Sequence, residues 1–179
     1  MRSEALEQKI NSRVVFVLPW VVLVAMTARS GAFRDFYSSP AGLLVVAGTF
    51  LFDTGGGRYR NRCDLFHPGG GHAWQDKLQL TGFERAAGVI ERGDALKVFA
   101  FEGLRLGVAV CYDIEFPLPV RAQYAAGARL LLVPSCTDTA AGATRVRVGC
   151  LARALENRCF VAQAVTAGEA PWSPALDVN

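Results

Sequence analysis

The segment GVAVCYDIEFP, residues 107–117, decides how the fold of this chain is interpreted. The small and apolar residues 107–110 predict a buried strand, and Pro117 suits the first turn of a helix, where proline is preferred. Cys111 is therefore expected at the carboxyl end of a strand and just before a helix. Ligand sites of open α/β sheets gather at such ends, where exposed backbone N–H groups favour a thiolate. The alternative is a thiol packed in the core, the usual fate of a free cysteine.

The residues on either side of this segment predict two kinds of connection. Upstream, apolar and alternating runs separated by glycine clusters predict strands joined by hairpins. Downstream, strands alternate with helical patterns. This succession predicts an α/β architecture in which helices pack on a mixed sheet. The expected elements are strands at 41–50, 58–67 and 72–80, a hairpin over 95–112 turning at Glu102-Gly103, a helix from 118 to near Gly127, a strand at 129–135, a helix at 142–157 and a strand at 158–165.

The composition is that of an ordinary globular protein. The 179 residues are 51% apolar and 20% charged, enough for one domain with a core. The net charge of +3 is spread without a basic run, which argues against a nucleic-acid or membrane-surface partner. The five cysteines contain no CxxC pair, so we expect no disulfide framework and a cytoplasmic location.

An apolar run near the amino terminus has two interpretations. VVFVLPWVVLVAMTA, residues 14–28, is uncharged, shorter than the ~20 residues that cross a bilayer, and interrupted by Pro19. A signal peptide is one interpretation, but Glu4 and Glu7 interrupt the basic region that such a peptide requires. A buried core segment is the favoured prediction.

Few side chains offer a partner for a cysteine nucleophile. In WQDKLQLTGFE, residues 74–84, alternation places Lys77 on the face opposite Trp74, and Glu84 follows seven residues later. His67 and His72 are predicted to be solvated turn residues. Together with Cys63 they match no zinc spacing, so no metal is expected.

Four sequence blocks together resemble the nitrilase superfamily of carbon–nitrogen hydrolases. The resemblance covers roughly residues 33–179 and leaves residues 1–32 as an unassigned apolar segment. It implies a layered α-β-β-α sandwich with mixed sheets, incomplete at both ends. The blocks, in order, are QDKLQLTGFE at 75–84, VCYDIEFP at 110–117, LLVPS at 131–135 and ARALEN at 152–157.

The resemblance implies a role for each candidate residue. Cys111 would be the nucleophile that attacks an amide or nitrile carbon. Lys77 would stabilise the developing oxyanion beside the backbone N–H of Tyr112, because a preorganised cation there stabilises the transition state. Glu84 resembles an additional glutamate that many members carry in the loop between the lysine and the cysteine, where it positions substrate and reacting groups.

Other residues near the site receive simpler interpretations. Ser135 and Cys136 follow a strand where the family's pocket wall runs, so we expect them to touch the substrate. Cys150 and Cys159 are predicted to be core residues. Two pairs are interpreted as structural rather than catalytic, namely Arg153 with Glu156, and Asp113 with Glu115.

The implied activity is hydrolysis of non-peptide carbon–nitrogen bonds through a cysteine thioester, with amides favoured over nitriles. Small-molecule substrates, no metal or organic cofactor, and a homodimer or larger homo-oligomer are implied with it. The family's general-base glutamate lies in a Pro-Glu pair near the amino terminus. This sequence contains no Pro-Glu pair, and Trp20 follows Pro19. The base is therefore expected upstream of this chain or is lost. The alternatives are an acyltransferase of the same superfamily and a truncated, non-catalytic member.

Overall fold

The computed structural model describes residues 45–67, 71–101 and 103–166, all within the unit Leu44–Asn179. The apolar run at 14–28 and the first residues of the strand expected at 41–50 lie outside the described residues. Within the described part of the chain, no helix is long and apolar enough to cross a membrane.

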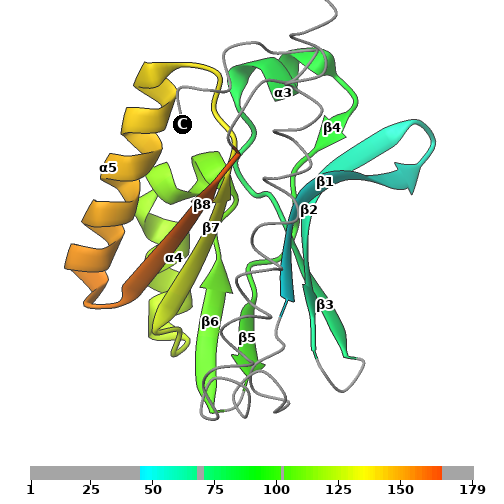
Figure 1. Cartoon of the computed structure of the whole chain (residues 1–179). Coiled ribbons are helices and arrows are strands. Elements are labelled where there is room, and N and C mark those ends of the chain that lie inside the picture. Colours follow the sequence, from blue (N-terminus) through cyan, green and yellow to red (C-terminus); the bar gives the residue numbers. More distant parts are fainter. Residues whose placement is uncertain (1–44, 68–70, 102, 167–179) are drawn as a thin grey trace, which may run out of the picture. The chain divides into compact units, whose positions relative to one another are not determined.

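Two sheets make up most of the described part, as Figure 1 shows. The first is an antiparallel sheet in the order β1-β2-β3, with a short strand parallel to β2. Its strands are β1 (Val45–Gly55), β2 (Arg58–Phe66), β3 (His72–Asp76) and β4 (Ile90–Glu91). The second is the mixed sheet that the sequence predicts, with an antiparallel hairpin followed by parallel pairs in the order β5-β6-β7-β8. Its strands are β5 (Val98–Phe101), β6 (Leu104–Val108), β7 (Leu130–Ser135) and β8 (Phe160–Val165).

The longer helices alternate with the parallel strands of the second sheet. A 3-10 helix, Cys111–Glu115, is followed directly by α4 (Pro117–Ala125), in which Pro117 takes the first helical position as predicted. α5 (Ala140–Asn157) connects β7 to β8. One short helix, α3 (Gly82–Ala87), connects β3 to β4 within the first sheet, in a segment that was expected to be a loop.

Three layers are visible in the described residues: helices, mixed sheet and antiparallel sheet. One core cluster fills the space between α4, α5 and the mixed sheet, and a second joins the two sheets. These layers confirm the α/β class, and a second helical layer is not among the described residues. The first cluster contains Ala109, Ile114, Val120, Leu131, Val133, Val146 and Cys150, and the second contains Cys63, Leu65, Phe99, Leu106, Val108 and Val110.

The strand expected through residue 80 ends earlier, at Asp76. The backbone N–H groups of Leu78 and Gln79 donate to the carboxylate of Asp113 instead of to a neighbouring strand. The turn to α3 begins there because Thr81 caps that helix. Alternation of side chains therefore stops at the residue before Lys77, and the position of Lys77 is set by other contacts.

Candidate active site

Cys111 lies where the sequence predicts it, after β6 and before α4, and its backbone is strained. Its φ of 49° falls in the left-handed region, which costs roughly 1–2 kcal/mol for a residue with a side chain. Non-glycine residues held in this region cluster at active sites, where the surrounding structure enforces the conformation. Here Cys111 opens the 3-10 helix that leads into α4. The conformation turns the chain sharply at the end of the mixed sheet.

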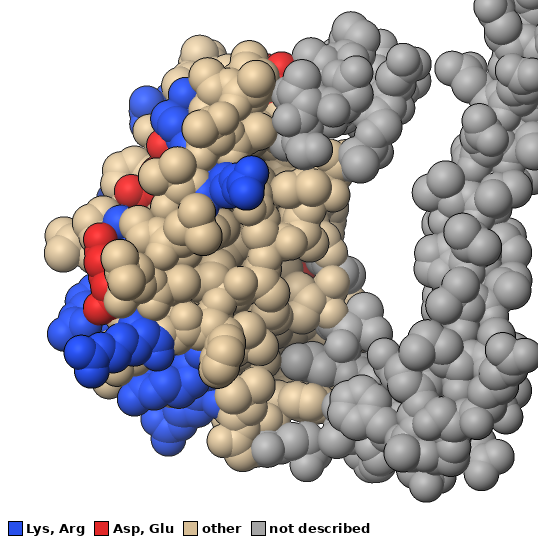
Figure 2. Space-filling view, turned by 60° about the vertical axis from the view of Figure 1, so that its left-hand side comes forward, with Lys and Arg blue, Asp and Glu red and all other residues tan. Residues whose placement is uncertain are grey.

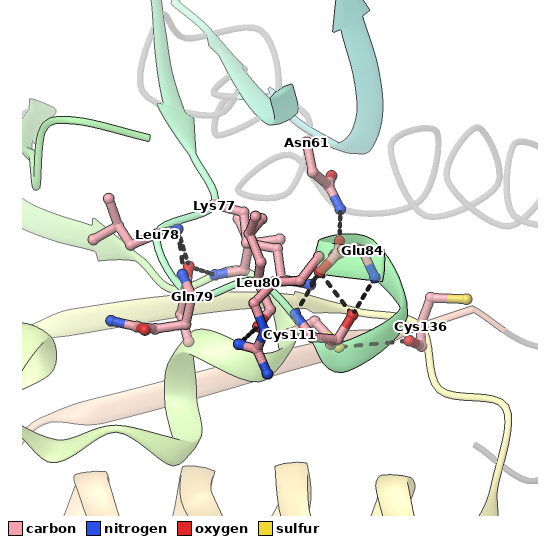
Figure 3. A network of polar contacts seen from close by, with 12 residues as sticks. Asn61, Lys77, Leu78, Gln79, Leu80, Glu84, Cys111 and Cys136 are labelled. Carbon is pink, nitrogen blue, oxygen red and sulfur yellow. Dashed lines mark hydrogen bonds and ion pairs between the residues drawn. The ribbon is translucent and has the colours of Figure 1, made fainter. Parts of the chain in front are cut away.

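The sulfur of Cys111 has two polar neighbours at the end of β7. Ser135 Oγ donates to Cys111 Sγ over 3.7 Å, and Sγ donates to the carbonyl of Cys136 over 3.5 Å. Ser135 is buried, whereas the Cys136 side chain is exposed and points away from Cys111 in Figure 3. The residues expected along the pocket wall thus flank the sulfur, one through its hydroxyl and the other through its backbone.

Lys77 follows the end of β3 and is almost inaccessible, at 3% exposure. Its Nζ donates to both carboxylate oxygens of Glu84, over 3.0 and 2.8 Å. The backbone is fixed on both sides, because its N–H donates to the Asn61 carbonyl over 2.8 Å and its carbonyl accepts from the Gly93 N–H over 2.7 Å. Lysine is almost never fully buried unless it is paired, so burial against one carboxylate sets Lys77 apart.

Glu84 is held by α3 in a geometry that favours its charged form. Thr81 caps the helix and Glu84 reaches back, so that its Oε2 accepts from the Thr81 N–H and hydroxyl, each over 2.8 Å. Asn61 Nδ2 lies 3.5 Å from Oε1. Burial alone would raise the pKa of Glu84, but the hydrogen bonds from Lys77 and Thr81 outweigh it and lower the pKa.

The Thr81–Glu84 contact explains why a helix forms here. Threonine followed three residues later by glutamate is the capping-box pattern, and Gly88 ends the helix in the left-handed region. This signal is present in the sequence. Recognising it would have placed Glu84 on a helix rather than in a loop.

Asp113 connects the lysine segment to the cysteine segment. Its side chain is 2% exposed. Oδ1 accepts from the N–H groups of Leu78 and Gln79 over 3.1 and 2.7 Å, and Oδ2 accepts from the Val110 N–H over 3.0 Å. Burial raises the pKa of Asp113 to about 6, against the lowering effect of these hydrogen bonds and of Lys77. The peptide groups next to Lys77 and Cys111 therefore meet at one carboxylate.

The side chains of Tyr112 and His72 interact with partners other than Lys77 and the sulfur of Cys111. The ring of Tyr112 packs edge-on against Phe116, with the ring centroids 5.0 Å apart. His72 begins β3, at the opposite end of that strand from Lys77, and its Nε2 lies 3.1 Å from Asp64 Oδ1. Within the described ranges, no group of histidine, cysteine, aspartate and glutamate is arranged to hold a metal ion.

An apolar groove of about 450 Å³ lies between β1 and one face of the mixed sheet. Its lining includes Val46, Phe101 and Leu132 but none of the candidate residues. The groove is therefore distinct from the candidate site around Cys111 and Lys77.

Residues 36–175 match the family model for carbon-nitrogen hydrolases, and the chain belongs to this family, within the nitrilase superfamily. It is 33% identical over 135 residues to the probable hydrolase YhcX of Bacillus subtilis (strain 168), a match that covers 75% of this chain and 26% of that protein. It is 30% identical over 125 residues to deaminated glutathione amidase of Yersinia enterocolitica, covering 70% of this chain and 42% of that one.

A solved structure has a similar fold. The amidase from Nesterenkonia sp. AN1, in a mutant with acrylamide added at the active-site cysteine, superimposes with a TM-score of 0.61 at 29% identity. That match covers 80% of this chain and 57% of the amidase. The chain thus spans between 26% and 57% of the length of these three proteins.

Proposed function

We propose that this chain carries the nucleophile region of an enzyme that hydrolyses non-peptide carbon–nitrogen bonds, with amides favoured over nitriles. The observation that carries the proposal is the buried Lys77–Glu84 ion pair, held beside the strained turn of Cys111 by Asp113. Two of the similar proteins are named as amidases, which favours an amide substrate.

The proposed reaction begins with attack of Cys111 Sγ on the amide carbon. The carbonyl oxygen becomes negative and is stabilised by the Lys77 ammonium and the backbone N–H of Tyr112. The carbon–nitrogen bond then breaks, the nitrogen takes up the proton that the Cys111 thiol has lost and leaves as ammonia or an amine, and a thioester remains on Cys111. Water attacks the thioester carbon, which releases the carboxylic acid and returns the thiol.

Glu84 orients Lys77 in this scheme. Its two carboxylate oxygens accept from Lys77 Nζ over 3.0 and 2.8 Å, which fixes the direction of the ammonium and pairs its buried charge. Ser135 and Cys136 would contact the substrate beside the sulfur, the first through its hydroxyl and the second through its backbone. No metal or organic cofactor takes part in the proposed steps.

The rate of hydrolysis is expected to be low for the chain as given. Each of the two steps needs a base, and a positioned acid–base group contributes roughly 100- to 10,000-fold. The family's base belongs to a Pro-Glu pair, which this sequence does not contain. Glu84 is already bound to Lys77 and Thr81. Fast hydrolysis would identify Glu84 as the first residue to test as the base.

The proposal can be tested by incubating the full chain with short-chain aliphatic amides. We expect slow ammonia release and an acyl adduct on Cys111, detected by mass spectrometry of peptides. The variant Cys111→Ser should lose both signals, and Cys136→Ser should keep them. A thioester that is discharged only by an added amine would assign acyl transfer instead. The absence of both adduct and ammonia would indicate a non-catalytic member of the family.

A homo-oligomer in the cytoplasm is proposed with this activity. The outward face of α5 exposes Val148, Leu151 and Leu155, and Leu118 of α4 is also exposed. Figure 2 brings the side of α5 forward and shows uncharged surface bordered by a cluster of basic residues. Exposed apolar side chains gathered on one helix favour association with another chain. All five cysteines are free, which favours a reducing compartment.

A further inference from the structure

We infer that Asp113 is a positioning residue, which sets Lys77 against Cys111 by accepting hydrogen bonds from the backbone on both sides of the site. This inference rests on the proposed function, because it assigns a role within the same site. The Leu78 N–H, next to Lys77, and the Val110 N–H, next to Cys111, donate to the same carboxylate over 3.1 and 3.0 Å. In Figure 3, Leu78 and Gln79 lie beside Lys77.

The need for such a residue follows from the sheet topology. Lys77 extends from β3 of the antiparallel sheet, whereas Cys111 follows β6 of the mixed sheet. The two sheets pack through apolar side chains, including Leu65 and Val108. Apolar contact is not directional, so it permits small shifts of one sheet relative to the other. Hydrogen bonds from both segments to one buried carboxylate define their relative position more narrowly.

The two oxygens of Asp113 serve different segments. Oδ1 accepts from Leu78 and Gln79, and Oδ2 accepts from Val110, with Leu78 also 3.3 Å away. A carboxylate is the side-chain group that offers two acceptor oxygens and no donor. An amide of the same shape offers one oxygen, so its NH₂ group must face an N–H donor on one side. Replacing Asp113 by asparagine therefore breaks the link on one side while almost preserving the volume.

A role confined to the local turn does not explain the whole arrangement. The bond from the Val110 N–H spans three residues and caps the 3-10 helix, as a local turn residue would. The bonds from Leu78 and Gln79 span 35 and 34 residues and contribute nothing to that cap. The shortest of the set, 2.7 Å from Gln79, is one of these long-range bonds.

The test compares Asp113→Asn with Asp113→Glu and with Glu115→Gln as a matched control. Glu115 is a carboxylate in the same turn whose partner is Arg145, at 3.5 Å, so it lies outside the link. The readout is the rate at which acrylamide alkylates each cysteine. For Asp113→Asn we expect alkylation of Cys111 to slow by about 10- to 100-fold, as an ~1 Å displacement of Lys77 implies. Alkylation of the exposed Cys136 should not change, and Glu115→Gln should behave as wild type.

Two results separate positioning from a purely structural role. Loss of packing would loosen the turn and speed the alkylation of Cys111 and of the buried Cys150, which is the opposite direction. Asp113→Glu keeps two acceptor oxygens. Its Cys111 should therefore be alkylated by acrylamide faster than that of Asp113→Asn, although the glutamate side chain is longer. Faster labelling of Cys150, or wild-type labelling of Cys111 in Asp113→Asn, overturns the inference.

Folding failure of both variants would move the decision to the wild-type protein. The backbone N–H groups of Leu78, Gln79 and Val110 should then show one common protection factor in hydrogen exchange, once each rate is divided by the intrinsic rate of that residue, because all three donate to one carboxylate. Protection factors that differ between Val110 and the other two would overturn the inference. Failure of the proposed function is recognised separately, as the absence of ammonia and of acyl adduct in the wild type, and it leaves these readouts intact.

Discussion

The Nζ atom of Lys77 and the carboxylate of Glu84 form an ion pair from which solvent is almost excluded, with both oxygens within 3.0 Å of the ammonium. Each charge depends on the other, because removing one partner leaves an uncompensated charge in a buried position. The pair therefore links the stability of the fold to the chemistry proposed for the site.

Replacing either partner alone is expected to destabilise the protein. Lys77→Met and Glu84→Gln should each lower the free energy of unfolding by about 3–5 kcal/mol. The double variant should recover most of that loss because no unpaired charge remains, yet it should form no acyl adduct on Cys111. Urea unfolding measures the first quantity and peptide mass spectrometry the second. A double variant as unstable as the sum of the two single variants would contradict this account.

Cys111 is expected to be the most reactive of the five cysteines. Burial raises the pKa of Cys63 to about 12 and that of Cys150 to about 11, and it also raises the pKa of Cys159. Cys136 is exposed, but its side chain points away from Cys111 (Figure 3). It therefore points away from the site in which Lys77 is proposed to favour a thiolate. Limited labelling with iodoacetamide and peptide mapping should find Cys111 modified first. Preferential labelling of Cys63 or Cys136 with Cys111 spared would argue against a nucleophile at this position.

Gly149 is expected to be required for the packing of α5 on the turn of Cys111. A Cβ at Gly149 would lie 3.0 Å from the Ile114 carbonyl oxygen and 3.1 Å from its Cγ2. Gly149→Ala should therefore destabilise the protein by about 1–3 kcal/mol, despite the better helix propensity of alanine. Gly82→Ala is the control, because a Cβ at this helical glycine meets nothing within 4 Å. Equal unfolding free energies for the two variants would show that the backbone at Ile114 can move aside without loss of stability.

The pH dependence of stability should carry the signature of Asp113. Its pKa is raised from 3.8 to about 6 in the folded protein by burial, with Lys77 acting in the opposite direction. The folded state thus holds this proton more tightly than the unfolded state does. The contribution of Asp113 to the free energy of unfolding therefore falls as the pH rises from about 4 to about 6, and it is constant above that. The difference in unfolding free energy between wild type and Asp113→Asn should follow this course. If the difference in unfolding free energy between the two proteins were the same at pH 4.5 and pH 7, a raised pKa of Asp113 would be excluded.

The exposed apolar face of α5 gives a prediction about assembly. Leu151 and Leu155 are 64% and 82% exposed, and a double substitution of both by glutamate should convert a homodimer into a monomer. Light scattering coupled to size exclusion measures the mass. Arg92→Glu, at an exposed position outside α5, is the charge control and should leave the assembly unchanged. A wild-type monomer at micromolar concentration would remove the basis for a homo-oligomer.

The order of elements could be predicted from the sequence because local patterns determine it. Apolar runs and glycine turns predicted β2, the β5–β6 hairpin and the β7-α5-β8 unit, and Pro117 indicated the start of α4. The end of β3 and the existence of α3 could not be obtained from alternation. Both depend on Asp113 and on the Thr81 cap, of which the first is a contact between residues distant in the sequence.

The candidate site was predictable to a different degree for each residue. Cys111 was identified from its place between a strand and Pro117, and Lys77 and Glu84 from family resemblance. Their roles stay predictions, although the structure pairs Lys77 with Glu84. Asp113 was interpreted as merely structural, because the sequence around a carboxylate two residues after a cysteine does not indicate which groups that carboxylate binds. What distinguishes it is burial together with two backbone donors from the segment that follows β3.

The link through Asp113 also bears on how the length of this chain can change. Leu78 and Asp113 are 35 residues apart in sequence, yet their contact closes the intervening segment into a loop whose two ends are fixed. The β5–β6 turn at Gly103, where φ is 79°, lies inside that loop and far along the chain from both ends. Inserted residues at this turn would lengthen the loop without separating its ends. Variation in length should therefore accumulate at the hairpin turn during evolution, while the spacing from Cys111 to Asp113 stays fixed.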